Sequence, residues 1–250
     1  MIYLDQFAMV AAPTVRSRAY TQAMKRANLL PRRILVLPGD EPIFSLPDTI
    51  KIKLRIDGPI VEFRPNETLA ETLAGCDVPV QVLASRDVNA KLCVAAIGSG
   101  PEPFLIYSGF GGVLLRSDIL ATGKKFLHIH GGYVPRYRGS TAFYFSLLEE
   151  FTLGATALLL DEGIDTGPVL LRRKYQAIRG VSIDYGLDPM MRADVLVDVL
   201  WQWTKAQKFV HEKVKDEASA TYYVIHPVLK HIALVRSGLV NAAVHDGNGA

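Results

Sequence analysis

His128 and His130 end one apolar segment of this chain, and Asp161 and Asp165 follow the next one, residues 155–160. Imidazole and carboxylate groups serve as general acids and bases, as hydrogen-bond donors to a developing oxyanion, and as metal ligands. Residues two apart on a strand face the same side, so both imidazoles should point together. Open α/β sheets bind ligands beyond the carboxyl ends of their strands. We therefore expect the two histidines and a carboxylate to converge on one crevice.

Each of these groups also has a purely structural interpretation. A histidine at a strand end often does no more than form a surface hydrogen bond. The segment DEGIDTG at 161–167 has the composition that tight turns select. Gly131 and Gly132 allow the backbone to turn sharply after the histidines. Only the combination of these features favours chemistry over structure.

Short apolar segments alternate with segments of helical capacity from residue 30 onward. We expect helices at 88–96 and 140–151, the second with Ser140 or Thr141 as its N-cap, and strands at 34–37, 78–83, 104–107, 126–129 and 155–160. Such alternation is typical of βαβ units. The strand segments lack strict polar alternation, as expected of strands buried on both faces. The predicted fold class is α/β, a Rossmann-like doubly wound and mostly parallel sheet.

The carboxyl-terminal part has a different pattern. The segment 168–175 follows its predecessor after a short turn, so we expect it to run antiparallel to its neighbour. Residues 193–210 form an amphipathic pattern typical of a helix, and 222–225 read as an edge strand. We assign no elements to 40–70 and expect the last six residues to be frayed. The chain should comprise an α/β domain over residues 1–180 and a short, mostly helical extension over 181–250, packed on it.

Composition and charge limit the class of protein. A chain of 250 residues with 49% hydrophobic and 21% charged side chains is typical of a globular domain. Its apolar runs are too short to span a membrane, and no basic segment precedes the first one, so we expect no signal peptide. Two cysteines, Cys76 and Cys93, make no disulfide framework, which favours a cytoplasmic location. A net charge of +3 does not indicate a nucleic-acid partner.

Residues 126–175 resemble the core of the 10-formyltetrahydrofolate-dependent formyltransferases. That family includes methionyl-tRNA, glycinamide ribonucleotide and sugar N-formyltransferases. Its pattern is Asn-x-His, a loop ending in Pro-x-x-x-Gly, a helix, then Gly-x-Thr and Asp-x-Gly-x-Asp-x-Gly. This chain has, in the same order and spacing, His130, 135–139, 154–156 and 161–167. The resemblance implies an N-formyltransferase that uses 10-formyltetrahydrofolate as co-substrate and needs no metal.

The resemblance also implies roles for the residues introduced above. His130 and Asp165 match the family's catalytic histidine and aspartate, and the aspartate is expected to raise the pKa of the histidine. His128 stands where the family has asparagine, whose amide donates a hydrogen bond to the formyl oxygen. An imidazole can also donate, but it is bulkier and changes charge near neutral pH. The oxyanion role is therefore expected of His128 with an altered pH dependence.

Donor and acceptor contacts follow from the same resemblance. The segment at 104–114 and the turn at 161–167 are expected to form the pterin pocket, with contacts from Tyr107, Gly109, Phe110, Gly111, Leu114, Asp161 and Gly163. For the acceptor we expect Arg136, Tyr137 and Arg138, with Arg172 as a further candidate. About 75 residues follow Tyr175, fewer than the β-barrel of methionyl-tRNA formyltransferases requires. The expected acceptor is thus a small primary amine, first a nucleotide-linked amino sugar, and a second copy of the chain, in a homodimer, is a further expected partner.

Two other functions stay open on the sequence alone. His-x-His is also a zinc-binding pattern, and Asp165 would supply a third ligand, as in a metal-dependent hydrolase. The histidine at position 128 also fits a family member that uses another one-carbon donor, or one that binds its ligand without catalysis.

Overall fold

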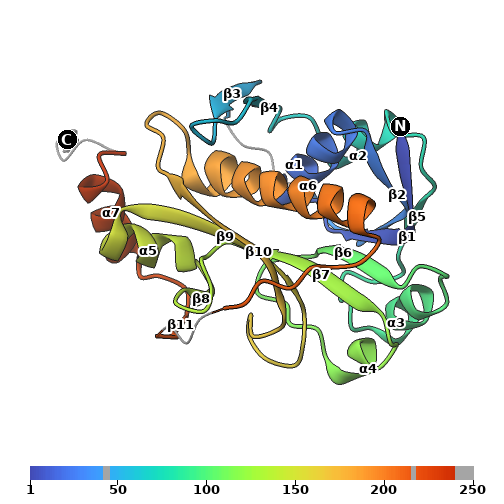
Figure 1. The fold of residues 1–250 in the computed structure, drawn as a ribbon. Helices are drawn as coiled ribbons and strands as arrows, with labels where there is room; N and C mark the ends of the chain where they lie inside the picture. Colours follow the sequence, from blue (N-terminus) through green and yellow to red (C-terminus); the bar gives the residue numbers. More distant parts are fainter. Residues whose placement is uncertain (42–45, 215–217, 240–250) are drawn as a thin grey trace, which may run out of the picture.

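A seven-stranded sheet forms the centre of the computed structural model, which describes residues 1–41, 46–214 and 218–239. Its strand order is β10-β9-β7-β6-β1-β2-β5 (Figure 1). The strands are β1 (Ile2–Ala11), β2 (Leu29–Val36), β5 (Val80–Val82), β6 (Phe104–Ser108), β7 (Lys125–His130), β9 (Thr152–Leu159) and β10 (Val169–Gln176). Five of them, from β5 through β7, are mutually parallel, while β9 runs antiparallel to both of its neighbours. The predicted α/β class and the antiparallel final strand are confirmed.

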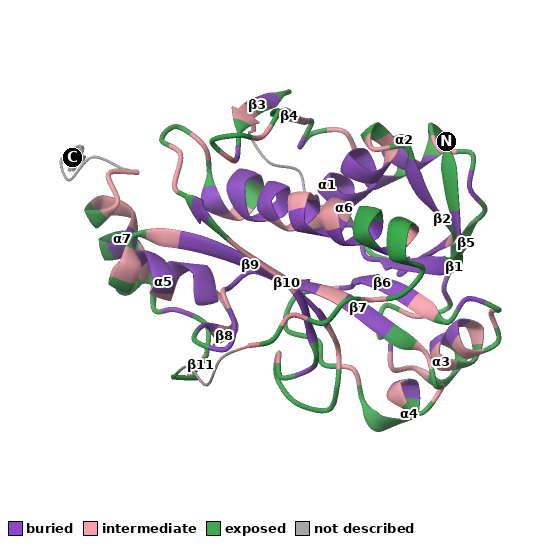
Figure 2. Cartoon of the chain, in the orientation of Figure 1, coloured by how far each residue is buried: buried purple, intermediate pink, exposed green. Residues whose placement is uncertain are grey.

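Helices cover both faces of this sheet (Figure 1). On one face lie α1 (Val15–Arg26) and α6 (Asp188–Ala206), and on the other α3 (Lys91–Gly98) and α4 (Ser117–Leu120). Each layer has its own hydrophobic cluster, and the central strands β6, β7 and β9 between them are mostly buried (Figure 2). This arrangement explains why the strand segments are apolar without alternation, since both sides of each strand face a helix layer.

The long helix α6 belongs to the core. Its apolar stripe, with Leu196, Val199 and Trp203, packs in the same cluster as α1. Asp188 and Pro189 open the helix, and Gln207 ends it in the left-handed conformation. The helix begins five residues before the amphipathic pattern suggested. The domain boundary expected at residue 180 stays a prediction.

Smaller elements complete the chain. They are β3 (Ile50–Lys53) and β4 (Ile60–Phe63), which form a hairpin, α2 (Leu69–Ala74), α5 (Ala142–Glu150), the π-helix η1 (Ile183–Leu187) and α7 (Pro227–Arg236). A separate two-stranded sheet joins β8 (Arg138–Gly139) to β11 (Thr221–Tyr222). The edge strand expected at 222–225 is therefore shorter, and it pairs with the loop after β7 instead of the main sheet. The last six residues lie outside the described residues.

The N-cap of α5 was expected to be Ser140 or Thr141. Thr141 occupies that position with φ 51°, but its hydroxyl forms no cap to the helix. Instead its Oγ accepts a hydrogen bond from the backbone N–H of Ile225 at 2.9 Å. The side chain thus ties the segment after β11 to the start of α5. In the described part of the chain, every helix is too short or too polar to cross a lipid bilayer.

Candidate active site

Strand β7 brings His128 and His130 to the same face, as the spacing predicted. Both side chains line one cavity of about 360 Å³. His128 lies between Tyr107 on β6 and Leu158 on β9, and His130 lies beside Thr156 on β9. The histidines therefore sit where β7 ends, within the sheet and flanked by strands on both sides.

Asp165 reaches this cavity by a route that the sequence did not indicate. We expected it at a carboxyl strand end next to that of β7, but β9 is antiparallel to β7, and Leu160 bonds back to Phe126. Thr156 of β9 pairs with His130, and the turn starts four residues later, at Leu160. At ~3.3 Å per residue, the turn therefore starts about 13 Å away from His130 along the strand. It folds back over this distance, and Asp165 adopts φ 52°. Gly167 permits the return, because a Cβ there would collide with the carbonyl oxygen of Leu159.

His130 is held at both ring nitrogens. Its Nδ1 lies 3.2 Å from Oδ2 of Asp165, and its Nε2 lies 2.8 Å from the carbonyl oxygen of Tyr137. A carbonyl only accepts, so Nε2 carries the hydrogen and Nδ1 faces the carboxylate. Asp165 also accepts a hydrogen bond from the backbone N–H of Gly139 at 2.9 Å. The loop between β7 and β8 thus orients both members of the pair.

A glycine makes this loop closure feasible. A Cβ at Gly132 would collide with the carbonyl oxygen of Tyr137 and with Nε2 of His130. The carbonyl oxygen of Gly132 also accepts a hydrogen bond at 2.6 Å from the hydroxyl of Thr156. The Gly-x-Thr motif therefore fixes the loop that holds His130.

Burial governs the charge of both histidines. Burial lowers the pKa of His128 well below its usual value, and the cations Arg16 and Arg192 lower it further. Burial also lowers the pKa of His130, and the carboxylate of Asp165 acts in the opposite direction without outweighing it. We expected the aspartate to raise the pKa of His130. Its effect has the expected sign, but the loss of water around a nearly covered ring is larger.

Two arginines that the sequence analysis did not select also line the cavity. Arg16 on α1 donates to the hydroxyl of Ser108 and to the carbonyl of Gly109. Arg192 on α6 pairs with Asp188 at 2.8 Å and donates to the carbonyl of Ile129. Within the described residues, Arg16 has no carboxylate within 4.0 Å. No local motif marked these arginines, because both lie more than 25 residues away in the sequence from the segment 128–165.

Two buried polar atoms of residues that line the cavity have no hydrogen-bond partner among the described residues. They are Nδ1 of His128 and the hydroxyl of Tyr107, whose rings lie 6.3 Å apart. Burial raises the pKa of Tyr107 to about 12, so its hydroxyl keeps its proton. A buried polar atom without a partner costs free energy, so such atoms mark a place where a ligand completes the site.

Most of the expected donor contacts line the same cavity. Tyr107, Phe110, Gly111, Leu114, Asp161 and Gly163 do so, and Gly109 accepts the hydrogen bond from Arg16. Exposed apolar side chains, those of Val113, Leu114 and Ile164, line the cavity beside the exposed Asp161 and Glu162. Asp161 caps its own turn by accepting from the N–H of Gly163 and the hydroxyl of Thr166.

The three residues expected to contact the acceptor substrate have different surroundings. Arg136 pairs with Glu149 and Glu150, and the hydroxyl of Tyr137 donates to Glu149, so both stabilise the packing of the loop on α5. Arg138 instead lines a second cavity of about 410 Å³, and its Nε is buried with no partner among the described residues. Arg172 pairs with Glu212 at one wall of this cavity.

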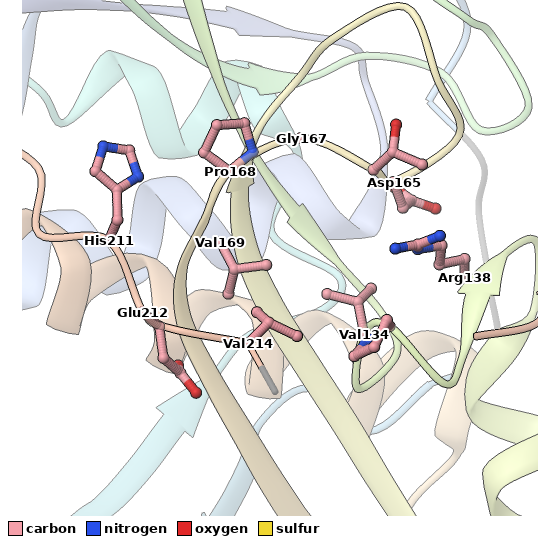
Figure 3. A pocket seen from close by; sticks show the side chains of 11 residues that line it. Val134, Arg138, Asp165, Gly167, Pro168, Val169, His211, Glu212 and Val214 are labelled. Atoms are coloured by element: carbon pink, nitrogen blue, oxygen red, sulfur yellow. The ribbon is translucent and has the colours of Figure 1, made fainter. Parts of the chain in front are cut away.

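Asp165 lines both cavities. Figure 3 shows Asp165 next to Arg138 on one side of the second cavity, with His211 and Glu212 on the other side. The carboxylate that contacts His130 is therefore reachable from two directions.

One further property of the site is its set of ligand atoms. His128, His130 and Asp165 each offer a metal-ligating atom, and these atoms all lie within 4.8 Å of one another. Two imidazole nitrogens and a carboxylate oxygen are ligands that divalent transition metals accept.

The fold and site together define an α/β protein with a buried histidine–aspartate pair beside a ligand cavity. Residues 85–185 match the model of the formyl transferase family. The resemblance expected from the sequence is thereby confirmed over these residues, where the chain is similar to the formyl transferase family.

Relatives with known names agree with this assignment. Methionyl-tRNA formyltransferase from Thermosynechococcus vestitus is 32% identical over 117 residues, 45% of this chain and 34% of that protein. The same enzyme from Caldanaerobacter subterraneus is 27% identical over 62% of this chain and 54% of that protein. The chain thus spans about a third to a half of the length of these relatives.

Solved structures share the fold. A sugar N-formyltransferase from a Shewanella species aligns with a TM-score of 0.58, 15% identity, and coverage of 93% of this chain and 87% of that chain. Glycinamide ribonucleotide transformylase 1 from Symbiobacterium toebii aligns with a TM-score of 0.57, 12% identity, and coverage of 84% and 91%. The Rossmann-like fold of this chain is the fold of these formyltransferases.

Proposed function

We propose that this chain transfers a formyl group from 10-formyltetrahydrofolate to a primary amine of a small acceptor. One observation carries the proposal: Nδ1 of His130 lies 3.2 Å from Oδ2 of Asp165, and both residues line the cavity that His128 also lines. The family match over residues 85–185 gives the class of reaction. The donor, the acceptor and the role of each residue are the finer parts of the proposal.

Neutral His130 acts as the proton acceptor in this reaction. The acceptor amine attacks the formyl carbon and a tetrahedral oxyanion forms, while a proton of the amine nitrogen passes through the carboxylate of Asp165 to Nδ1 of His130. The imidazolium so formed donates to Asp165, and its Nε2 stays bound to the carbonyl of Tyr137. The intermediate then collapses as the bond from carbon to N10 breaks, and the proton passes to N10. The products are the formamide and tetrahydrofolate.

The oxyanion needs hydrogen-bond donors fixed before its charge develops. A neutral His128 with its hydrogen on Nδ1 supplies one donor, because that atom has no partner within the described chain. Arg16 and Arg192 line the same cavity and add positive potential. A histidine in place of the family's asparagine therefore keeps a donor at the formyl oxygen.

The donor's flat ring fits the cavity between the segment at 107–115 and the turn at 160–165. Its volume of about 360 Å³ falls in the range of small-molecule pockets, ~300–1,000 Å³. Exposed apolar side chains line it, and Leu114, which is 61% exposed, is available to cover a ring. These features support a pterin at this position.

For the acceptor we favour the second cavity, which adjoins the first through Asp165. Arg138 and His211 line it and suit an anionic group, such as the phosphates of a nucleotide-linked amino sugar. The sugar N-formyltransferase of the Shewanella species, which has the same fold, makes this acceptor the first candidate. A small amine also agrees with a net charge of only +3.

The test is a screen of amines with 10-formyltetrahydrofolate, following loss of the donor's formyl group. The panel contains nucleotide-linked amino sugars, glycinamide ribonucleotide and methionyl-tRNA. We expect a nucleotide-linked amino sugar to be formylated by the wild type and not by His130→Ala. Arg138→Ala should raise the KM for the acceptor and leave that for the donor unchanged. Turnover by well-folded His130→Ala at the wild-type rate would overturn the proposal.

A further inference from the structure

The histidine at position 128 gives this chain a set of ligands that the family pattern lacks. The pattern has an amide at this position, and an amide is a poor ligand for zinc-like ions compared with imidazole. Here the three side chains are two imidazoles and a carboxylate, with their ligand atoms within 4.8 Å of one another. We propose that His128, His130 and Asp165 bind one divalent transition-metal ion of the Zn²⁺ class.

The distances suit an ion of this size. Bonds of ~2.0–2.1 Å in tetrahedral geometry place neighbouring ligand atoms about 3.3–3.4 Å apart. Nδ1 of His130 and Oδ2 of Asp165 are already 3.2 Å apart. Nδ1 of His128 has no hydrogen-bond partner among the described residues and is therefore available to complete the set. The fourth position then faces the cavity that both histidines line.

The surroundings of two of these ligands are those of metal-bound side chains. Metal-ligating histidines donate their other ring N–H to a carbonyl or carboxylate, and ligating carboxylates are themselves hydrogen-bonded. Nε2 of His130 donates to the carbonyl oxygen of Tyr137 at 2.8 Å, which leaves the lone pair on Nδ1. Asp165 accepts from the N–H of Gly139 at 2.9 Å. Both ligands are thus oriented before an ion arrives.

The charges around the site set its strength. Arg192 is neutralised by Asp188 at 2.8 Å, whereas Arg16 has no carboxylate within 4.0 Å in the described residues. Asp161 and Glu162 also line the cavity and partly offset that cation. With three protein ligands and a guanidinium nearby, we expect a dissociation constant in the micromolar range, and an anion or hydroxide as the fourth ligand.

Metal binding and formyl transfer exclude each other in this arrangement. The ion occupies the lone pair of His130 that would accept the amine's proton, and it takes the carboxylate that would stabilise the resulting imidazolium. This consequence rests on the proposed function, whereas the metal site itself does not. Zn²⁺ should therefore inhibit transfer, and a chelator should restore it.

Calorimetric titration of the chelator-treated protein with Zn²⁺ tests the site without reference to activity. We expect one ion per chain, binding at least 10-fold weaker in His128→Asn and in Asp165→Asn, and unchanged binding in His231→Asn. The last variant makes the same chemical change at an exposed histidine on α7. Absorption of the Co²⁺ form in the visible range reports the coordination in the wild type alone, so the test does not depend on how a variant folds.

The outcomes separate this inference from the proposed function. Absence of Zn²⁺ binding by the wild type, equal binding by His128→Asn, or loss of binding in His231→Asn would overturn the metal site, whatever the enzyme assay gives. If no amine is formylated but one ion binds through His128, the metal site stands and the transferase proposal fails. If formyl transfer occurs and Zn²⁺ does not inhibit it, the prediction that metal binding and formyl transfer exclude each other is wrong.

Discussion

Two regions of the molecule supply the histidines, carboxylates and arginines of the cavity that His128 and His130 line. The window from 104 to 165 supplies His128, His130 and Asp165, together with the cavity rim. Helices α1 and α6 supply Arg16 and Arg192 from the opposite ends of the chain. The first group makes direct contacts within itself, as in the 3.2 Å approach of His130 to Asp165. In the second group, Arg16 donates to the hydroxyl of Ser108 and the carbonyl of Gly109, and Arg192 donates to the carbonyl of Ile129 and pairs with Asp188.

This difference separates two tasks. In the proposed reaction, the residues from 104 to 165 accept and donate protons, so we expect them to decide whether transfer occurs. The two helices carry fixed cations, which lower the pKa of His128 and favour a developing negative charge. Removing a residue of the first kind should abolish transfer, while removing one of the second kind should slow it. The predictions below test this division.

The largest effect is expected for the pair in the window. His130→Ala removes the proton acceptor, and Asp165→Asn removes the charge that stabilises its cation. Each should lower kcat by about 10³-fold or more, because the two groups act as a unit. Formyl loss from the donor in the presence of the best amine is the measurement, with circular dichroism as the control for folding. Loss of less than 10-fold in both variants would mean that the reaction does not use this pair.

Arg16→Met should have the next largest effect. It removes a cation that lines the cavity and two hydrogen bonds, to the hydroxyl of Ser108 and the carbonyl of Gly109. We expect kcat/KM to fall by about 10- to 100-fold, less than for an oxyanion donor in direct contact. Arg16→Lys keeps the charge and should retain part of the activity. Equal losses in both variants would show that Arg16 acts through the shape of its hydrogen bonds and not through its charge.

The window could be predicted from the sequence because its features are local. His128 and His130 share a strand face through a spacing of two, and the turn at 161–167 has a recognisable composition. Even here the strand direction was wrong: β9 runs antiparallel to β7, and Asp165 arrives by a backward fold of the turn. The motif identified the residues of the site. The path of the chain depends on how the strands pair, and local sequence does not determine that pairing.

The first strand and the arginines could not be predicted in this way. β1 lies at the centre of the sheet, but Asp5 and Gln6 interrupt its apolar run, and its register with β2 shifts between Leu4 and Ala8. The role of Arg16 depends on where β1 places the start of α1, so missing the strand meant missing the residue. The segment 40–70 holds a hairpin whose strands are only four residues long, too short for a periodic signal.

His128→Asn tests whether an amide can replace the imidazole at position 128. It restores the amide of the family pattern, so it keeps a hydrogen-bond donor while removing the imidazole. We expect kcat to stay within about 10-fold of the wild type in chelator-treated protein, since one donor replaces another. Steady-state kinetics with the best amine is the measurement. Complete inactivation would mean that the imidazole has a task that an amide cannot perform.

The same variant should change the dependence of stability on pH in metal-free protein. The pKa of His128 lies well below 6.5 in the folded state, because the buried ring disfavours the charge. Below pH 6.5 the unfolded chain therefore binds more protons, and the stabilising contribution present above that pH is lost as the pH falls. The loss is up to about 1.4 kcal/mol per pH unit for this group. Urea denaturation at pH 7.5, 6.0 and 5.0 should give a flatter dependence for His128→Asn.

The smallest effect is expected for Arg136, which lies in the loop between the histidines and α5. Its guanidinium is about half exposed and pairs with Glu149 at 3.2 Å and Glu150 at 2.8 Å. Exposed ion pairs contribute about 0–1 kcal/mol, so Arg136→Ala should leave kcat and KM within about 2-fold of the wild type. Its neighbour Arg138, with a buried Nε, is the matched contrast. A rise in acceptor KM for Arg136→Ala as large as that for Arg138→Ala would move the acceptor from the second cavity to the outer face of this loop.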